Sequence, residues 1–230
     1  RLAEIAIGWA PFQVWSVRQL HEGRFVEFRK HEVDWGSDRL VSALAAADLD
    51  GSGLEALILG RNAGENMRWE AHRFWPNVEG RVTVNQRIGS PQGEQWGDER
   101  GVAALAAGDL DGDGDDEVIV GRTAGDNLRW AASSLRPQSP HHRGINLRGE
   151  FVPFGSPQGE GWGEDRGVTA LATGDLDGDG RDEVVVGRNA GDNLRWAAHR
   201  FVDGDFVQRG SAQGEGWGDT RGVTALATGD

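Results

Sequence analysis

Short hydrophobic runs alternate along the chain with polar turns that are rich in glycine. The runs VTALATG (168–174), EVVVG (183–187), NLRWAAHRF (193–201) and DFVQRG (205–210) are typical examples. They alternate hydrophobic and polar positions or are rich in β-branched residues, as strands are. No window places apolar residues at helical spacing between helix caps. The pattern therefore predicts an all-β fold.

The same series of strands recurs along the chain. Repeat 3, GVTALATGDLDGDGRDEVVVGRNAGDNLRW (167–196), nearly copies repeat 2, GVAALAAGDLDGDGDDEVIVGRTAGDNLRW (101–130). Repeat 1, LVSALAAADLDGSGLEALILGRNAGENMRW (40–69), is a weaker copy. The chain ends on RGVTALATGD (221–230), which opens a fourth copy, and begins with RLAEIAIGWAPFQVW (1–15), which matches its continuation. Self-similarity of this kind predicts four repeats of about 57 residues each.

Four strands in about 57 residues, repeated around an axis, are the content of a β-propeller blade. We predict one β-propeller of four-stranded antiparallel blades, in which both termini close the last blade. The alternative is a piece of a larger propeller, and because the chain begins at Arg1 we expect a processed or trimmed product. The predicted single domain covers 1–230, with blades at about 222–230 plus 1–34, 35–95, 96–161 and 162–221.

The net charge of the chain limits the classes of partner that it can bind. Lys and Arg number 24 against 37 Asp and Glu, which gives a formal net charge of −13. Binding to nucleic acid phosphates needs a basic face, so this balance argues against it. No apolar run approaches the ~18–20 residues of a membrane span, so we expect no membrane insertion. The absence of cysteine excludes disulfides, thiolate metal sites and a cysteine nucleophile.

An acidic loop follows the first strand of each repeat. Carboxylates alternate with glycines there, so that a short loop can curl around one ion, and Ca²⁺ takes six to eight oxygen ligands. Clustered carboxylates without a cation would repel one another, although a solvated acidic turn is the alternative. In repeat 1 the loop is weaker, because Ser52 replaces an aspartate and Ala56 stands where the glutamate is needed. The predicted calcium ligands are Asp109, Asp111, Asp113, Asp115 and Glu117 in repeat 2, Asp175, Asp177, Asp179, Arg181 (by its carbonyl) and Glu183 in repeat 3, and more weakly Asp48, Asp50 and Ser52.

A second set of residues recurs in the linkers GSPQGEQWGDERG (89–101), GSPQGEGWGEDRG (155–167) and GSAQGEGWGDTRG (210–222). A tryptophan ring can stack on a sugar, while carboxylate and guanidinium groups bond its hydroxyls. Alternatively, the tryptophan wedges between blades and the arginine pairs with the next blade. The candidate ligand-binding residues are Gln92, Glu94, Trp96, Arg100, Gln158, Glu160, Trp162, Arg166, Gln213, Glu215, Trp217 and Arg221.

The run GDLDGDGRDEVVVG (174–187), with its flanking strands, resembles the FG-GAP and VCBS repeats of integrin-type propellers. The resemblance extends over essentially the whole chain and implies calcium in the acidic loops. Two departures stand out: Arg-Gly replaces Phe-Gly before the first strand, and Gly-Arg-Asn or Gly-Arg-Thr replaces Gly-Ala-Pro after the second. The resemblance therefore implies fold and calcium better than it implies a partner.

Duplicated units create equivalent sites, whereas catalysis needs one distinct constellation, so we expect no enzyme. The main hypothesis is a secreted or cell-surface calcium-binding propeller that binds a glycan or glycoprotein as a lectin-like or adhesion module. The alternative is a structural or protein-binding domain of a larger cell-surface protein or enzyme. If the chain is catalytic, polysaccharide lysis or hydrolysis near His141 is the expected chemistry. The sequence leaves the oligomeric state open.

Overall fold

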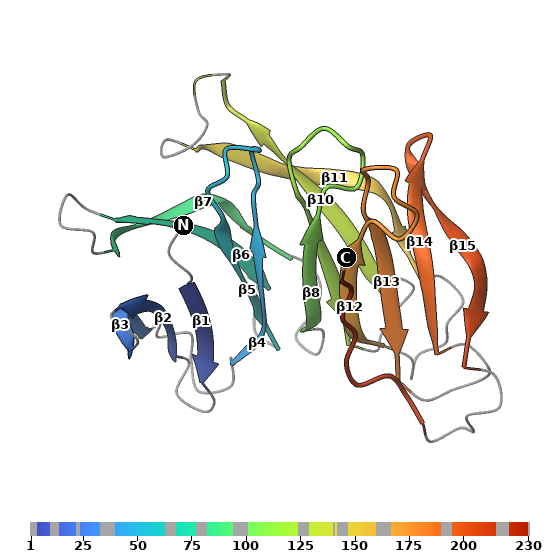
Figure 1. Ribbon diagram of the computed structural model, residues 1–230, viewed down its shortest axis with the longest axis horizontal. Helices are drawn as coiled ribbons and strands as arrows, with labels where there is room; N and C mark the ends of the chain where they lie inside the picture. Colours follow the sequence, from blue (N-terminus) through green and yellow to red (C-terminus); the bar gives the residue numbers. More distant parts are fainter. Residues whose placement is uncertain are drawn as a thin grey trace.

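The computed structural model describes residues 4–9, 14–21, 24–32, 40–62, 68–76, 82–93, 101–123, 129–139, 141, 147–159, 167–189, 195–214 and 221–229. All of its regular elements are strands that pair antiparallel with their neighbours in sequence, as Figure 1 shows. No helix within these residues is long and apolar enough to cross a membrane.

Three sheets have four strands each, in sequence order, and correspond to repeats 1, 2 and 3. Sheet 1 consists of β4 (Val41–Ala47), β5 (Ala56–Arg61), β6 (Trp69–Pro76) and β7 (Val82–Gln92). Sheet 2 consists of β8 (Val102–Gly108), β9 (Glu117–Arg122), β10 (Trp130–Pro137) and β11 (Gly149–Gln158). Sheet 3 consists of β12 (Val168–Gly174), β13 (Glu183–Arg188), β14 (Trp196–Val202) and β15 (Asp205–Gln213). The all-β fold and the four-stranded antiparallel blades of these three repeats are thus confirmed.

The second strand of each sheet is buried along its whole length. These strands contain continuous apolar runs, such as VIV in β9, because both of their faces are covered, in sheet 3 by sheet 2 and by residues 221–229. Each also contains one glycine against which the next repeat packs. A Cβ at Gly60, Gly121 or Gly187 would lie 2.6, 2.5 or 2.6 Å from a Cγ1 of Val102, Val168 or Val223. The glycine therefore sets how closely successive repeats approach.

Aromatic side chains make the second repeated contact between sheets. Trp69 of β6 packs edge-on against Phe151 of β11, with ring centroids 4.7 Å apart. Trp130 of β10 packs in the same way against Phe206 of β15, at 4.8 Å. Both tryptophans are almost fully buried. One set of tryptophans in the repeat thus holds each sheet to the sheet that follows.

The described residues at the two ends of the chain contact different sheets. Residues 4–32 form a separate three-stranded sheet of β1 (Glu4–Trp9), β2 (Val14–His21) and β3 (Arg24–Glu32), which contacts β4. Residues 221–229 lie along sheet 3, where Val223 N donates to the Arg188 carbonyl at 2.9 Å. In Figure 1 the C-terminus lies beside β12, whereas β1 lies beside β4. Among the described residues no sheet joins 221–229 to β1, so closure and the number of blades stay predictions.

Candidate metal-binding loops

Loop 2, residues 109–116, joins β8 to β9 and is folded around its first aspartate. The Asp109 carboxylate accepts backbone hydrogen bonds from Gly112 (2.7 Å) and Asp113 (3.1 Å) through Oδ1 and from Gly114 (2.9 Å) through Oδ2. Gly112 and Gly114 have φ values of 82° and 88°, which favour glycine. The alternation of aspartate and glycine therefore lets one carboxylate organise the whole turn.

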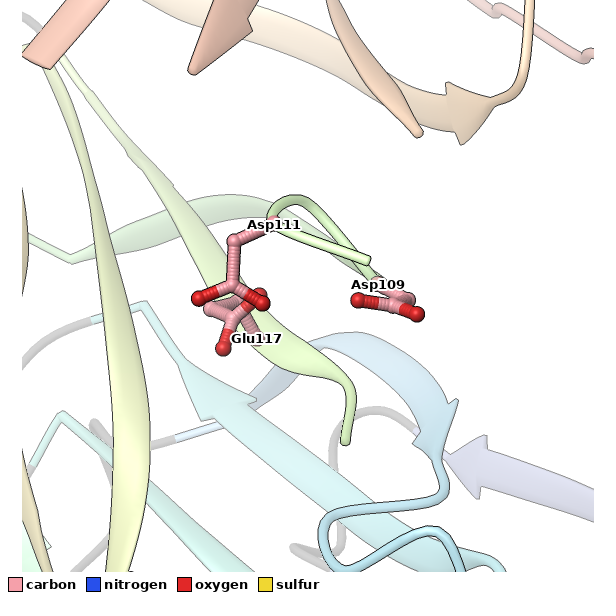
Figure 2. A group of neighbouring side chains, drawn as sticks. All are labelled: Asp109, Asp111 and Glu117. Atoms are coloured by element: carbon pink, nitrogen blue, oxygen red, sulfur yellow. The ribbon is translucent and has the colours of Figure 1, made fainter. Parts of the chain in front are cut away.

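The carboxylates of loop 2 converge on the start of β9. Glu117 is 2% exposed, and its Oε2 accepts a hydrogen bond from Leu110 N at 3.1 Å. Asp109, Asp111 and Glu117 each offer an oxygen within 4.8 Å of the others. Figure 2 shows the Asp111 and Glu117 carboxylates lying together, with Asp109 across the turn. Three carboxylates in this arrangement could hold a metal ion.

Loop 3, residues 175–182, repeats this geometry almost atom for atom. Asp175 accepts from Gly178, Asp179 and Gly180 at 2.7, 3.0 and 2.8 Å. Glu183, which is fully buried, accepts from Leu176 N at 2.9 Å through Oε2. Its Oε1 receives no hydrogen bond from the part of the chain that the structure describes. Asp175, Asp177 and Glu183 form the second group that could hold a metal.

The electrostatics of both loops favour a cation. Burial raises the pKa of Glu117 to about 9, and the charges of Asp111 and Asp113 add to this effect. Burial likewise raises the pKa of Glu183. At a pKa of about 9, the Glu117 carboxyl keeps its proton at neutral pH unless a positive charge replaces that proton. A divalent cation with oxygen ligands would supply the charge, so these residues fit a metal of the calcium type.

Loop 1, residues 48–55, has the same backbone turn with other partners. Asp48 accepts from Ser52 N (3.1 Å) and Gly53 N (2.6 Å), as the first aspartate does in the other loops. Asp50 is 2% exposed, accepts from the Ser52 hydroxyl at 2.7 Å, and forms an ion pair with Arg73. In contrast to loops 2 and 3, it belongs to no group of three acidic residues within the described chain.

The remaining predicted ligands of loops 2 and 3 face the turn or the solvent. Asp113 accepts from Asp115 N at 2.9 Å, and Asp179 accepts from Arg181 N at 3.1 Å. Both aspartates are exposed and lie outside the two groups of three. The predicted carbonyl ligands, those of Asp115 and Arg181, belong to the same turns.

Two aspartates that the sequence analysis did not single out connect neighbouring loops. Asp116 Oδ2 accepts from Asp48 N at 2.7 Å, and Asp116 N donates to the Asp48 carbonyl at 2.9 Å. Asp182 N donates to the Asp109 carbonyl at 2.8 Å in the next pair of repeats. The recurrence of aspartate directly before Glu117 and Glu183 was the available signal.

The candidate ligand-binding linkers are described only in part. The Gln92, Gln158 and Gln213 amides donate to the carbonyl of the serine two residues earlier, at 2.9, 3.1 and 2.9 Å. These amides therefore have a local partner in each repeat, and Arg221 is exposed. Eight candidates lie outside the described residues: Glu94, Trp96, Arg100, Glu160, Trp162, Arg166, Glu215 and Trp217.

Comparison with known proteins agrees with the repeat. Residues 167–205 match the FG-GAP repeat model. No curated protein matches the chain. Among solved structures, the exotype rhamnogalacturonan lyase YesX is similar to this chain at 20% sequence identity and a TM-score of 0.30. The alignment covers 85% of this chain and 40% of the lyase chain. The chain thus spans less than half the length of that lyase. Loop 3 and its flanking strands β12, β13 and β14 thus match an FG-GAP repeat, and the four-stranded sheets of repeats 1 and 2 have the same order of strands.

Proposed function

We propose that loops 2 and 3 each bind one Ca²⁺ ion and that these ions stabilise the propeller. The observation that carries the proposal is the pair of buried glutamates, Glu117 and Glu183, each placed at the base of an acidic turn. Burial makes either carboxyl costly to charge without a nearby cation. Arg209 Nε lies 4.0 Å from Glu183 Oε1, yet the pKa of Glu183 stays raised. Oxygen ligands from aspartates, a glutamate and a backbone carbonyl suit Ca²⁺ better than softer metals.

The ions would act on more than one sheet. Each loop joins the first two strands of its own sheet, and Asp116 and Asp182 bond it to the preceding loop. A cation that fixes the loop therefore also supports the contact between repeats. Binding to the folded state alone raises stability with ligand concentration.

The test compares thermal melts in calcium and in EDTA with measured calcium content. Wild-type protein should bind two ions and melt at a lower temperature in EDTA. Glu117→Gln mimics the neutral carboxyl and keeps an acceptor for Leu110 N, so it should bind one ion and lose little stability in EDTA. The matched variant Glu55→Gln lies in loop 1, outside both groups of acids, and should still bind two. An unchanged melt in EDTA together with metal-free protein would refute the proposal.

We further propose that the propeller is a binding module of a secreted or cell-surface protein, with a glycan or glycoprotein ligand. The linkers that recur three times support it, because equivalent weak sites give avidity on a repeated ligand. FG-GAP repeats occur in extracellular and cell-surface proteins. A structural or protein-binding role in a larger protein is the second candidate, and binding rather than catalysis is expected of equivalent sites.

Glycan-array binding in calcium and in EDTA separates these candidates. A lectin-like module should bind in calcium and lose binding in EDTA or on Trp162→Ala, with its melting temperature retained. If Trp162→Ala instead lowers the melting temperature by several degrees and no glycan binds, the linker tryptophans pack between blades and the structural role holds.

We also propose that residues 4–32 and 221–229 complete one blade next to sheet 3. Val223 packs on Gly187 as Val102 and Val168 pack on their glycines, so 221–229 occupies the place of a first strand. Trp196 is half-buried and lines a shallow pocket with His199 and Ala212, where Trp69 and Trp130 of the other sheets meet a phenylalanine. The sequence Gly23-Arg24-Phe25 repeats the Gly-x-Phe spacing that places Phe151 and Phe206, and would supply that ring.

A further inference from the structure

An arginine of β6, the third strand of sheet 1, places its positive charge in loop 1. The Arg73 side chain is 1% exposed, and its two terminal nitrogens lie 3.3 and 3.1 Å from Asp50 Oδ2 and Oδ1. Nη2 also donates to the Leu54 carbonyl at 2.6 Å. The guanidinium thus forms a bidentate ion pair and one further charge-assisted hydrogen bond, and all of the acceptors belong to loop 1.

The oxygens that Arg73 contacts stand where the calcium ligands of the other loops stand. Asp50 corresponds to Asp111 and Asp177, the middle members of the two metal-binding groups. Leu54 corresponds to Asp115 and Arg181, whose carbonyls are the predicted backbone ligands. One guanidinium therefore bonds a carboxylate and a carbonyl that the other loops would offer to a metal.

The strand register explains how this exchange arises. Arg73 of β6 pairs directly with Ala56 of β5, and Ala56 stands where repeats 2 and 3 have Glu117 and Glu183. Loop 1 lacks the buried glutamate and one aspartate of loops 2 and 3, and it has on the neighbouring strand an arginine that repeat 2 lacks. The absence of these acids and the presence of a base both bring the loop toward neutrality.

We infer that the guanidinium of Arg73 takes the place of calcium in loop 1, and that the residue at this strand position sets how strongly each loop binds the metal. The position holds Arg73, Ser134 and Arg200 in repeats 1, 2 and 3. Loop 1 then needs no ion, loop 2 binds calcium without competition from this strand position, and loop 3 binds it against its own arginine. The second half of this inference rests on the proposed calcium function.

In loop 3, arginines from β14 and β15 contact the acidic residues themselves. Arg200 Nη1 lies 3.3 Å from Asp177 Oδ2, and its Nη2 bonds Asp179. Arg209 of β15 bonds the same oxygen of Asp177. These arginines are partly exposed, in contrast to Arg73, so they can swing away from the loop when an ion enters. Loop 2 has Ser134 and Phe154 at the two matching positions and so offers its acids no such partner from β10 or β11.

Exchanging the residues between repeats tests the inference. The probe is Ca²⁺ alone, followed by calorimetric titration and by metal content. Wild-type protein should show one tighter and one weaker site. Arg200→Ser should tighten the weaker site by about tenfold or more, because a charge-assisted contact with Asp177 is removed. Ser134→Arg should abolish or strongly weaken the tighter site and should raise the melting temperature in EDTA.

Loop 1 gives the sharper test. Ser52→Asp with Ala56→Glu restores both lost acids while Arg73 remains, and this variant should bind two ions, as wild-type protein does. Adding Arg73→Ser to that pair should create a third site. If the variant that retains Arg73 binds the third ion as tightly, the inference is wrong.

A readout without metal separates this inference from the calcium proposal. In EDTA, Arg73→Ser should lower the melting temperature, since it leaves Asp50 buried without its ion pair, whereas Arg200→Ser at the partly exposed position should lower it much less. If no variant binds calcium but this difference in EDTA is found, the calcium proposal fails and the role of Arg73 in loop 1 stands. If Arg73→Ser melts like wild-type protein in EDTA, the role of Arg73 is refuted.

Discussion

A double-mutant cycle at Trp196 and Phe25 would decide whether the two ends of the chain complete a blade. The reference pair is Trp130 and Phe206, whose rings meet edge to face at 4.8 Å with an interplanar angle of 65°. Trp130 is 1% exposed and buries about 200 Å² of mostly apolar surface, which is worth roughly 5 kcal/mol at 25 cal/mol/Å². Trp130→Ala should therefore cost about 3–5 kcal/mol of unfolding free energy.

The coupling free energy between two rings is smaller than the cost of truncating either ring, but it reports specifically on contact between the two. Edge-to-face aromatic pairs contribute about 0.5–1.5 kcal/mol beyond the area that they bury. The Trp130–Phe206 cycle should return a coupling of that size. If residues 4–32 pack on sheet 3, the Trp196–Phe25 cycle should return the same coupling, and Trp196→Ala should cost as much as Trp130→Ala.

The assay is urea unfolding of wild-type protein, both single variants and the double variant of each pair, in excess calcium so that every variant stays folded. In an open array of sheets, Trp196 stays half-buried and far from Phe25, and substitutions at distant sites add within about 0.3–0.5 kcal/mol. A Trp196–Phe25 coupling below about 0.3 kcal/mol, beside a normal reference cycle, would refute closure of the blade.

Two further predictions test the packing and the charge of the sheets. Gly121→Ala places a Cβ 2.5 Å from Val168 Cγ1 and should cost about 1–3 kcal/mol, whereas Gly229→Ala, with nothing within 4 Å, should be neutral in the same urea assay. Burial lowers the pKa of His199 to about 4, so this histidine stays neutral in the folded state while the unfolded chain takes up a proton below about pH 6.5. The contribution of neutral His199 to stability is therefore complete above about pH 6.5. Between pH 7 and pH 5, the free energy of unfolding of wild-type protein should fall by about 1–2 kcal/mol more than that of His199→Ser. Serine is chosen because repeat 2 has Ser133 at this position. Equal losses in wild-type protein and His199→Ser would show that the folded state does not hold His199 neutral.

The strands and the acidic turns could be predicted because their causes are local. Period-two runs such as 168–174 specify a strand, β12, and alternating aspartate and glycine specify a turn that folds around its first carboxylate. Near-identical copies then extend each local signal to the next repeat. These features depend on neighbours within a few residues, which a single sequence displays directly.

The partners across the sheet could not be predicted in the same way. Arg73 and Asp50 are 23 residues apart, and their contact depends on the register of β6 against β5. Asp116 of repeat 2 accepts a hydrogen bond from Asp48 N of repeat 1, which is 68 residues earlier in the chain. The amides of the linker glutamines bond nearby serine carbonyls, and their role in ligand binding stays a prediction. Sequence shows which side chains can make such bonds, but only the packing of sheets decides which of them meet.

If calcium binds as proposed, the position of loop 2 should give its ion more influence on stability than the ion of loop 3. Loop 2 is bonded to loop 1 through Asp116 and Asp48, and to loop 3 through Asp182 and the Asp109 carbonyl. The Arg181 side chain also lies over Gly112, where a Cβ would come within 3.2 Å of it. Loop 2 has Ser134 where loop 3 has Arg200, and Phe154 where loop 3 has Arg209, so removal of calcium should leave its carboxylates with less compensating charge than those of loop 3. We therefore expect the first step of unfolding in EDTA to open both interfaces of sheet 2 together, which amide hydrogen exchange along β8 and β12 would detect as a shared loss of protection.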